Sequence, residues 1–233
     1  MRVTRREQRR EETEAEIKEV ARRQMADVGA AALSLRSIAR EIGLTAPALY
    51  RYFDNRDALV TALIVEAYSS LAAAMAAADA ANIADDFYGR FQATAFAFRH
   101  WAVQHPQDFA LIYGTPIPGY VAPREQTVAP AAQVLQVIGF VLTEAWQAGK
   151  LTLPASYQDL SPELELVVAE ILRDLPQDVP AAGVLLTMSI WARLYGVVWG
   201  ELYEHFIPGL AESGALYQME VAAICAELGL VNL

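Results

Sequence analysis

The chain has 233 residues, of which 55% are hydrophobic and 20% are charged. This composition excludes a mainly disordered chain, and the length is sufficient for one large domain or two small ones. The single cysteine, Cys225, excludes a disulfide within the chain and favours a reducing, cytoplasmic compartment. The arginine-rich N-terminus has no apolar run behind it, so we expect no signal peptide.

The net charge of −10 is distributed unevenly. Residues 1–60 hold 12 Lys/Arg and 10 Asp/Glu, whereas residues 61–233 hold 6 and 18. The first ten residues contain five arginines, namely Arg2, Arg5, Arg6, Arg9 and Arg10. We expect residues 1–10 to be a flexible basic arm, which either contacts DNA or is only a solvated tail.

The first ordered element is predicted to be a helix over about 11–28, where apolar residues recur at helical spacing until Gly29. The stretch from Ser34 to Phe53 then predicts two short helices separated by a turn at Gly43. Thr45 is a suitable N-cap for the second helix, and Pro47 falls in its first turn. This is the pattern of a helix-turn-helix, which places one short helix in the DNA major groove.

A long helix is predicted next, from Asp57 to about Asp79, because this stretch contains no glycine or proline and its second half is mostly alanine. We expect it to act as a lever between two domains. The predicted domains are a helix-turn-helix domain over 1–58 and a helical domain for effector binding and dimerisation over 59–233.

The rest of the chain is also predicted to be helical, because no segment alternates as a strand does. The fold class is therefore all-α. The expected helices span 84–104, 106–113, 124–149, 162–175, 179–207 and 213–229. Residues 181–200 have Arg193 as their only charge, but glycines and hydroxyl residues interrupt the stretch, so we expect a buried helix and no membrane partner.

Helix 179–207 carries two rows of side chains that suggest an interface. Trp191, Tyr195, Trp199 and Tyr203 form an aromatic row, and Ala192, Gly196 and Gly200 form a row of small residues. Because a helix that is apolar nearly all round must be covered, we favour a homodimer, with Leu216 and Met219 of the last helix adding to the interface. The alternative is that both helices lie in a large monomeric core.

Residues 11–60 resemble the DNA-binding domain of the TetR (tetracycline-repressor-like) family. The resemblance rests on Arg36-Ser37-Ile38-Ala39 with Gly43, then on the segment from Pro47 to Phe53 and on Asn55-Arg56-Asp57-Ala58-Leu59. Further along, residues 105–109 resemble the opening of the family's sixth helix. Residues 191–196 resemble the Trp-x-x-x-His-Gly signature of one subclass, with Tyr195 in place of histidine.

The resemblance implies an all-helical homodimer that binds a palindromic double-stranded DNA operator and loses DNA affinity when a small molecule binds. It also implies DNA-binding roles for residues of the helix-turn-helix and the start of the long helix. These residues are Arg36, Thr45, Ala46, Pro47, Ala48, Tyr50, Arg51, Tyr52 and Arg56. Arg51 is the main candidate for base reading, Arg56 for phosphate binding, and Thr45 for either phosphate binding or capping.

The aromatic content of the second half, together with the resemblance, suggests a hydrophobic or aromatic effector. The candidate ligand-binding residues are Phe91, Phe98, Trp101, Tyr113, Trp146, Trp191 and Tyr195. Two alternatives remain open, namely a DNA-binding regulator without an effector and an all-helical enzyme. No phosphate-binding glycine loop or metal-ligand spacing of the three histidines is present, so we expect no enzyme, cofactor or metal.

Overall fold

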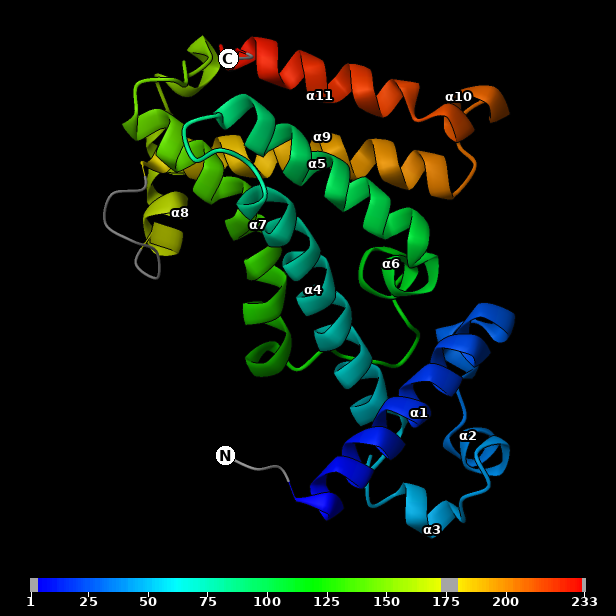
Figure 1. Cartoon of the computed structure of the whole chain (residues 1–233). Helices are drawn as coiled ribbons and strands as arrows, with labels where there is room; N and C mark the ends of the chain where they lie inside the picture. The colour runs from blue at the N-terminus through cyan, green and yellow to red at the C-terminus, as the bar shows by residue number, and fades with distance from the viewer. Residues whose placement is uncertain (1–3, 173–179, 232–233) are drawn as a thin grey trace. The chain divides into compact units, whose positions relative to one another are not determined.

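The computed structural model describes residues 4–172 and 180–231, and this part of the chain is all-helical, with no strand, as predicted (Figure 1). The α-helices are α1 (Arg5–Val28), α2 (Leu35–Glu41), α3 (Ala46–Leu49), α4 (Arg56–Ala80), α5 (Phe87–Gln104), α6 (Pro106–Tyr113), α7 (Arg124–Gln147), α8 (Pro162–Leu172), α9 (Ala181–Leu202), α10 (Pro208–Ser213) and α11 (Ala215–Glu227). Two 3₁₀ turns, η1 (Ala30–Ala32) and η2 (Ala155–Tyr157), lie between them.

The start of α1 corrects the expectation of a flexible arm over residues 1–10. Residues 5–10 are helical, because Thr4 and Glu7 form a reciprocal capping box. The Glu7 amide donates to Thr4 Oγ1 at 3.2 Å, and the Thr4 amide donates to Glu7 Oε2 at 2.8 Å. The prediction of flexibility was therefore wrong for these residues, whereas residues 1–3 lie outside the described part.

The C-terminal half also departs from the predicted bounds. Helix α9 ends at Leu202, and Glu204 adopts a left-handed conformation with φ of 57°. Pro208 begins the short helix α10 instead of only ending its predecessor, since a proline is compatible with the first helical turn. The predicted helical residues 173–175 and 179 lie outside the described part.

The chain divides into two compact units. Unit 1 comprises residues 1–69 and 105–131, and unit 2 comprises residues 70–104 and 132–233. The boundary predicted near residue 58 therefore lies within unit 1, and α4 and α7 each contribute to both units. Unit 1 is larger than the expected helix-turn-helix domain because α6 packs against α1.

The core of unit 1 is built from α1 to α4, with Ile17, Ile38, Leu49 and Leu59 among its buried residues. Segment 105–131 is attached to this core by apolar contacts of Leu111, Ile112, Ile117 and Tyr120. Polar bonds reinforce the attachment. Arg22 Nε lies 2.9 Å from Asp108 Oδ1, and the hydroxyls of Thr61 and Tyr120 are 2.9 Å apart.

Unit 2 is held together by α5, α9 and α11, which pack against one another. The buried Tyr217 hydroxyl of α11 donates to the Ala95 carbonyl of α5 at 2.7 Å. Residues of α9 that face these neighbours, such as Ile190, Leu194 and Val198, are buried. Unit 2 thus joins the helices by both apolar packing and a buried hydrogen bond.

Helices α4, α7 and α9 are long and apolar enough to cross a membrane by length and composition. In the most apolar 18-residue stretch of α9, only 33% is buried, so the expectation of a buried helix holds for one side of α9. On that side Arg193 forms ion pairs with Glu220 and Glu227 of α11. Met188, Ala192 and Gly196 of α9 are exposed.

Candidate functional site

The helix-turn-helix is formed by α2, a turn at Gly43 and α3. Gly43 has φ of 70°, a left-handed conformation that glycine adopts without a steric penalty. The Ser37 amide donates to Ser34 Oγ at 3.4 Å, so Ser34 caps α2. Helix α3 is a single turn, and Leu49 and Phe53 bury its inner side. The local sequence therefore presents a short, anchored helix.

Helix α1 holds α2 in position. Arg23 Nη2 lies 2.9 Å from Glu41 Oε1, and Gln24 Nε2 donates to Ser37 Oγ at 3.1 Å. Arg36 and Arg40, which are four residues apart and adjacent on the α2 surface, are exposed. Neither has an ion-pair partner within residues 4–172 and 180–231. Sequence reasoning selected Arg36 and missed Arg40, although the four-residue spacing was visible.

The outward side of α3 carries the predicted reading residues. Pro47 and Arg51 are exposed to solvent, and Tyr50 is 42% exposed. Ala46 and Ala48 are half-buried. In the described part of the chain Arg51 has no ion-pair partner, so its guanidinium is available to a base edge or a phosphate. The structure thus places an apolar patch on α3 and an exposed cation, Arg51, in the turn that follows this helix.

Three of the predicted contact residues also have structural roles. Thr45 Oγ1 accepts from the Ala48 amide at 3.3 Å, which is the N-cap that the sequence suggested. Tyr52 packs against the core of unit 1. Arg56 Nη2 donates to the Ala30 carbonyl at 3.0 Å, so Arg56 ties the start of α4 to η1. Phosphate binding by Arg56 stays a prediction.

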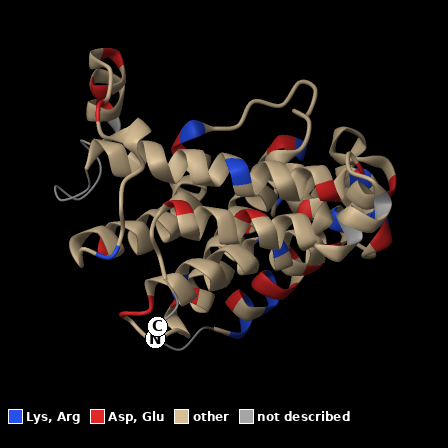
Figure 2. Ribbon diagram, turned by 90° about the horizontal axis from the view of Figure 1, so that it is seen from above, with Lys and Arg blue, Asp and Glu red and all other residues tan. Residues whose placement is uncertain are grey.

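The electrostatic difference between the units favours DNA at unit 1. By sequence, unit 1 contains 13 Lys/Arg and 13 Asp/Glu, whereas unit 2 contains 5 and 15. The whole net charge of −10 therefore belongs to unit 2, whose helices carry acidic residues in several places (Figure 2). A phosphate backbone is repelled by unit 2 and meets no net negative charge on unit 1.

The predicted ligand residues fall into separate groups. Phe91, Phe98 and Trp101 are buried in unit 2, and the rings of Phe98 and Trp191 are 4.7 Å apart. Trp101 Nε1 donates to Ser70 Oγ at 3.0 Å. Tyr195 is half-buried, and this burial raises the pKa of its hydroxyl. Phe98 of α5 and Trp191 of α9 are therefore in ring contact.

The two other predicted ligand residues are Tyr113 and Trp146. Tyr113 belongs to unit 1, where its ring lies edge-on to Tyr68 with centroids 5.8 Å apart. Trp146 lies near the end of α7 and is 40% exposed.

The predicted dimer residues mostly lie on the surface of α9 and α11. Ala192, Gly196 and Tyr203 are exposed, Met219 is 61% exposed and Leu216 is half-buried.

Trp199 is half-buried and stacks on His205, with ring centroids 4.6 Å apart and planes 9° apart. Gly200 was also predicted to lie in the dimer interface, but it is not on the surface. It is buried, and Phe206 occupies the space where a Cβ atom would be. The prediction of Gly200 in a dimer surface was therefore wrong, because its own chain covers it.

The described residues contain no cluster of three or more His, Cys, Asp or Glu side chains that could hold a metal ion. Cys225 is buried, and desolvation raises the pKa of its thiol to about 11. A thiol with that pKa is protonated at neutral pH, so Cys225 serves as a small packing residue.

Both halves of the chain match known protein families, and both match the same one. Residues 17–63 match the family model for bacterial regulatory proteins of the tetR family, and residues 91–224 match the model for the tetracyclin repressor-like C-terminal domain. The HTH-type transcriptional regulator Rv1816 of Mycobacterium tuberculosis is 35% identical over 97% of both chains.

Solved structures show the same architecture. The crystal structure of SCO4313, described as a regulatory protein, is 34% identical and covers 96% of this chain and 100% of its own, with a TM-score of 0.77. PfmR of Thermus thermophilus, a TetR family regulator, is 16% identical and covers 93% and 99% of the two chains, with a TM-score of 0.57. The latter likeness concerns the fold alone.

Proposed function

Because this chain belongs to the TetR family of bacterial regulatory proteins, we propose that it is a ligand-responsive repressor that binds a palindromic operator as a homodimer. The family consists of transcription regulators and not of enzymes. The observation that carries the proposal is the set of exposed arginines without ion-pair partners on the helix-turn-helix, of which Arg51 lies just after α3.

In the proposed complex α3 enters the major groove. Arg51 donates to the O6 and N7 atoms of guanine, and Pro47 and Ala48 contact thymine methyl groups. Arg36 and Arg40 of α2 bind phosphates, which set the register of the protein and the salt dependence of binding. The Tyr50 hydroxyl donates a further hydrogen bond to a phosphate of the DNA backbone. The helix-turn-helix thus combines one sequence-reading cation with several phosphate contacts.

Dimerisation is proposed through the exposed sides of α9 and α11. Ala192 and Gly196 allow close approach of a second helix, while Met188, Tyr203 and Met219 supply apolar area. A two-fold dimer presents two copies of α3 to two half-sites, which are about 34–36 Å apart on one face of DNA. A palindromic operator follows from that symmetry.

The effector is proposed to act on the aromatic side chains of α5 and α9, around Phe98 and Trp191. Helix α5 is followed directly by α6, which the ion pair of Arg22 and Asp108 binds to α1. A shift of α5 would therefore be transmitted through α6, and through the continuous helix α4, to the DNA-binding residues. The effector lowers DNA affinity if it favours a spacing of the two α3 helices that the operator does not match.

The proposal is tested by footprinting the purified protein on the DNA that flanks its own gene. We expect a protected palindrome at moderate salt, and a duplex with one half-site scrambled serves as the control. Absence of any protected palindrome contradicts the proposal. Thermal-shift screening with hydrophobic and aromatic metabolites then identifies an effector, since a ligand specific to the native state raises the melting temperature.

A regulator without an effector is the second candidate. Phe91, Phe98 and Trp101 are all buried, which is also what a filled core requires. That candidate predicts that no compound raises the melting temperature and also releases the operator. The effector hypothesis predicts that one compound does both.

A further inference from the structure

Helix α1 extends well beyond the domain that it stabilises. Its first buried residue is Ile17, so residues 5–16, about three turns, add nothing to the core. The match to the family model for the DNA-binding domain also begins at residue 17. The first turns of α1 thus lie outside the matched part of the DNA-binding domain, and packing in the core does not explain them.

These turns carry a concentrated charge. Arg5, Arg6, Arg9 and Arg10 are exposed, and none has an ion-pair partner among the residues that the structure describes. Positive charge near a helix N-terminus is unfavourable, because it opposes the helix dipole. Arginines four residues apart, such as Arg6 and Arg10, also repel each other. Such a locally unfavourable cluster is typical of a functional surface.

Two of the four tip arginines, Arg6 and Arg10, project on the side of α1 that belongs to the DNA-reading domain. Arg6 and Arg10 share a side of the helix with Ile17 and Ala21, because the intervals of four, seven and four residues return to the same side. Ile17 and Ala21 are in the core of unit 1. Figure 1 shows the first turns of α1 at the same edge of the unit as α3.

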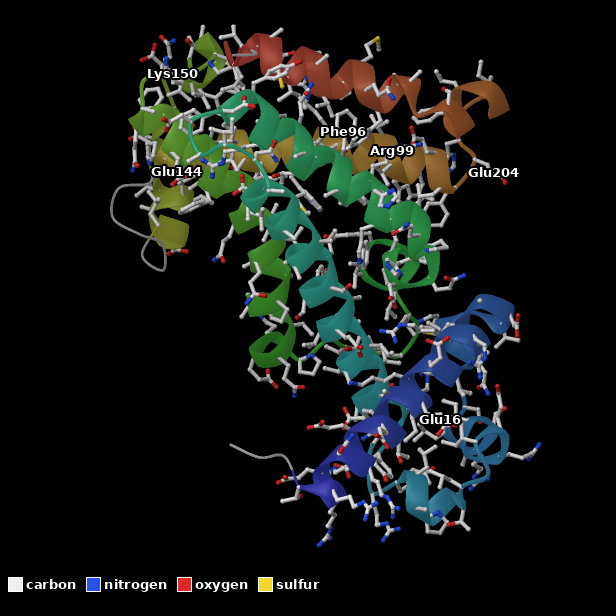
Figure 3. The ribbon with its side chains drawn as sticks, viewed as in Figure 1. Glu16, Phe96, Arg99, Glu144, Lys150 and Glu204 are labelled. Atoms are coloured by element: carbon white, nitrogen blue, oxygen red, sulfur yellow. The ribbon has the colours of Figure 1, made fainter. Side chains whose placement is uncertain are left out.

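The acidic residues of α1 limit the region that DNA can contact. Glu11, Glu12, Glu14 and Glu16 follow the arginines, and Glu7 is the single acid between Arg5 and Arg10, so charge is segregated along the helix into a mainly basic tip and an acidic middle. In Figure 3 Glu16 marks this middle portion. An anionic polymer is attracted by the tip and repelled by the middle. Residues 5–16 also lack large apolar side chains, which a membrane-binding helix requires.

We propose that Arg5, Arg6, Arg9 and Arg10, the basic tip of α1, bind backbone phosphates of duplex DNA that flanks the half-site read by α3. This inference rests on the proposed DNA-binding function and adds a second contact region to it. The tip continues the helix of α1, which is packed from Ile17 onward, so it reaches a defined position along the duplex. It adds affinity and salt dependence but no base preference, since phosphate contacts carry no sequence information.

The test compares the full-length wild type with a variant in which all four tip arginines are replaced by Gln. Each phosphate contact contributes about 0.9 to the slope of log K against log salt. We expect the slope of the variant to fall by about 2 to 4 for each dimer and its affinity to fall at least tenfold near 0.1 M salt. The ranking of operator sequences stays unchanged.

Two comparisons separate a phosphate contact from a loss of structure. A variant with the four arginines replaced by Lys keeps the cations and restores most of the slope, and circular dichroism checks that all variants retain their helix. Operator duplexes with shortened flanks weaken binding of the wild type but not of the Gln variant. The double variant Arg124→Gln with Lys150→Gln, which removes exposed cations elsewhere, leaves the slope nearly unchanged.

The inference is overturned if the Gln variant binds long and short duplexes with the same affinity and slope as the wild type. In that outcome the proposed function stands and the basic tip is only a solvated surface. If the wild type binds no duplex at all, the proposed function itself fails, and the inference fails with it.

Discussion

The two units differ in their use of arginine, because unit 1 combines ion-paired arginines, such as Arg22 and Arg23, with unpaired ones. In unit 1, the arginines of the α1 tip, the exposed side of α2 and the end of α3 are solvated and have no ion-pair partner within the described part of the chain. In unit 2, each arginine that the structure describes pairs with carboxylates. Arg90 pairs with Asp79 and Glu144, Arg99 with Glu201, and Arg193 with Glu220 and Glu227.

This difference separates structural arginines from those available to a ligand. Arg90 is only 7% exposed. If it bound a ligand instead, the negative charges of Asp79 and Glu144 would be left without a cation. In Figure 3 Arg99 extends from α5, and its Nε donates to Glu201 Oε2 at 2.7 Å. An exposed arginine such as Arg51 makes no such bond and remains free for phosphate or base. Arginine content alone would not distinguish the two uses.

The largest expected effect is on Arg90 of unit 2, a buried cation that pairs with the partly exposed carboxylates of Asp79 and Glu144. Replacing Arg90 by Met leaves both carboxylates without their cation, and we expect the free energy of unfolding to fall by about 2–4 kcal/mol, less than for a fully buried pair because Glu144 is screened by solvent. Chemical denaturation monitored by circular dichroism measures the change. Lys150→Gln, which removes an exposed cation of the same unit, is the control and should change stability by less than about 0.5 kcal/mol. Equal effects of the two variants would refute the comparison.

Arg51→Ala is expected to have the next largest effect, on specificity instead of stability. Loss of a bidentate base contact should cost about 1–3 kcal/mol of discrimination at one operator position in each half-site. Binding competition among duplexes that differ at single positions measures this. If binding to all sequences weakens equally, Arg51 contacts phosphate and the assignment to a base is wrong.

Glu201→Gln tests the pairing in unit 2 by pH. Burial raises the pKa of Glu201 above its ordinary value of 4.5, although Arg99 opposes the shift. Its Oε1 atom is buried with no hydrogen-bond partner among the described residues. The protonated form therefore stabilises the fold below pH 4.5, and this contribution is lost as the pH rises through the folded-state pKa.

Glutamine imitates the protonated carboxyl group and does not titrate. The Gln variant therefore keeps the stability that the wild type loses as the pH rises. We expect its stability relative to the wild type to increase as the pH is raised from about 4 to about 7, as measured by urea midpoints at each pH. Lys150→Gln serves again as the control and should follow the wild-type profile. A relative stability that decreases over this range contradicts the assigned direction.

The smallest effect on stability is expected for Arg40→Gln in unit 1. Arg40 is exposed on α2 without a partner in the described part of the chain, so the free energy of unfolding should change by less than about 0.5 kcal/mol. The salt slope of operator binding should fall by about 1 for each phosphate that Arg40 binds in the wild type. A destabilisation comparable to that of Arg90→Met would show that exposed arginines also support the fold.

Features encoded over a few residues were predictable from the sequence. The caps at Ser34 and Thr45, the turn at Gly43 and the start of α6 at Pro106 depend on neighbours within about one helical turn. The attachment of α6 to unit 1 was not predictable. It depends on Arg22 and Asp108, which are 86 residues apart, and many other carboxylates could have paired with that arginine.

The candidate site shows the same division. The exposed and buried sides of α3 follow from helical periodicity. Arg51, which the resemblance made the main candidate for base reading, is exposed just after this helix. Helical periodicity also placed Gly200 in a row with Ala192 and Gly196, but Phe206 folds back over it and removes it from the surface. Periodicity predicts which residues share a side of a helix, and it does not predict which other segment covers that side.

The sequence by itself determined that this protein is all-helical, that it carries a TetR-type helix-turn-helix and that its basic residues gather near the N-terminus. These properties are set by local propensity, capping and composition. Only the tertiary structure decided that α6 belongs with the DNA-reading unit, and which arginines are paired and which are free. The physical reason is that pairing and coverage depend on residues distant in the chain, whose meeting is set by packing of the whole unit.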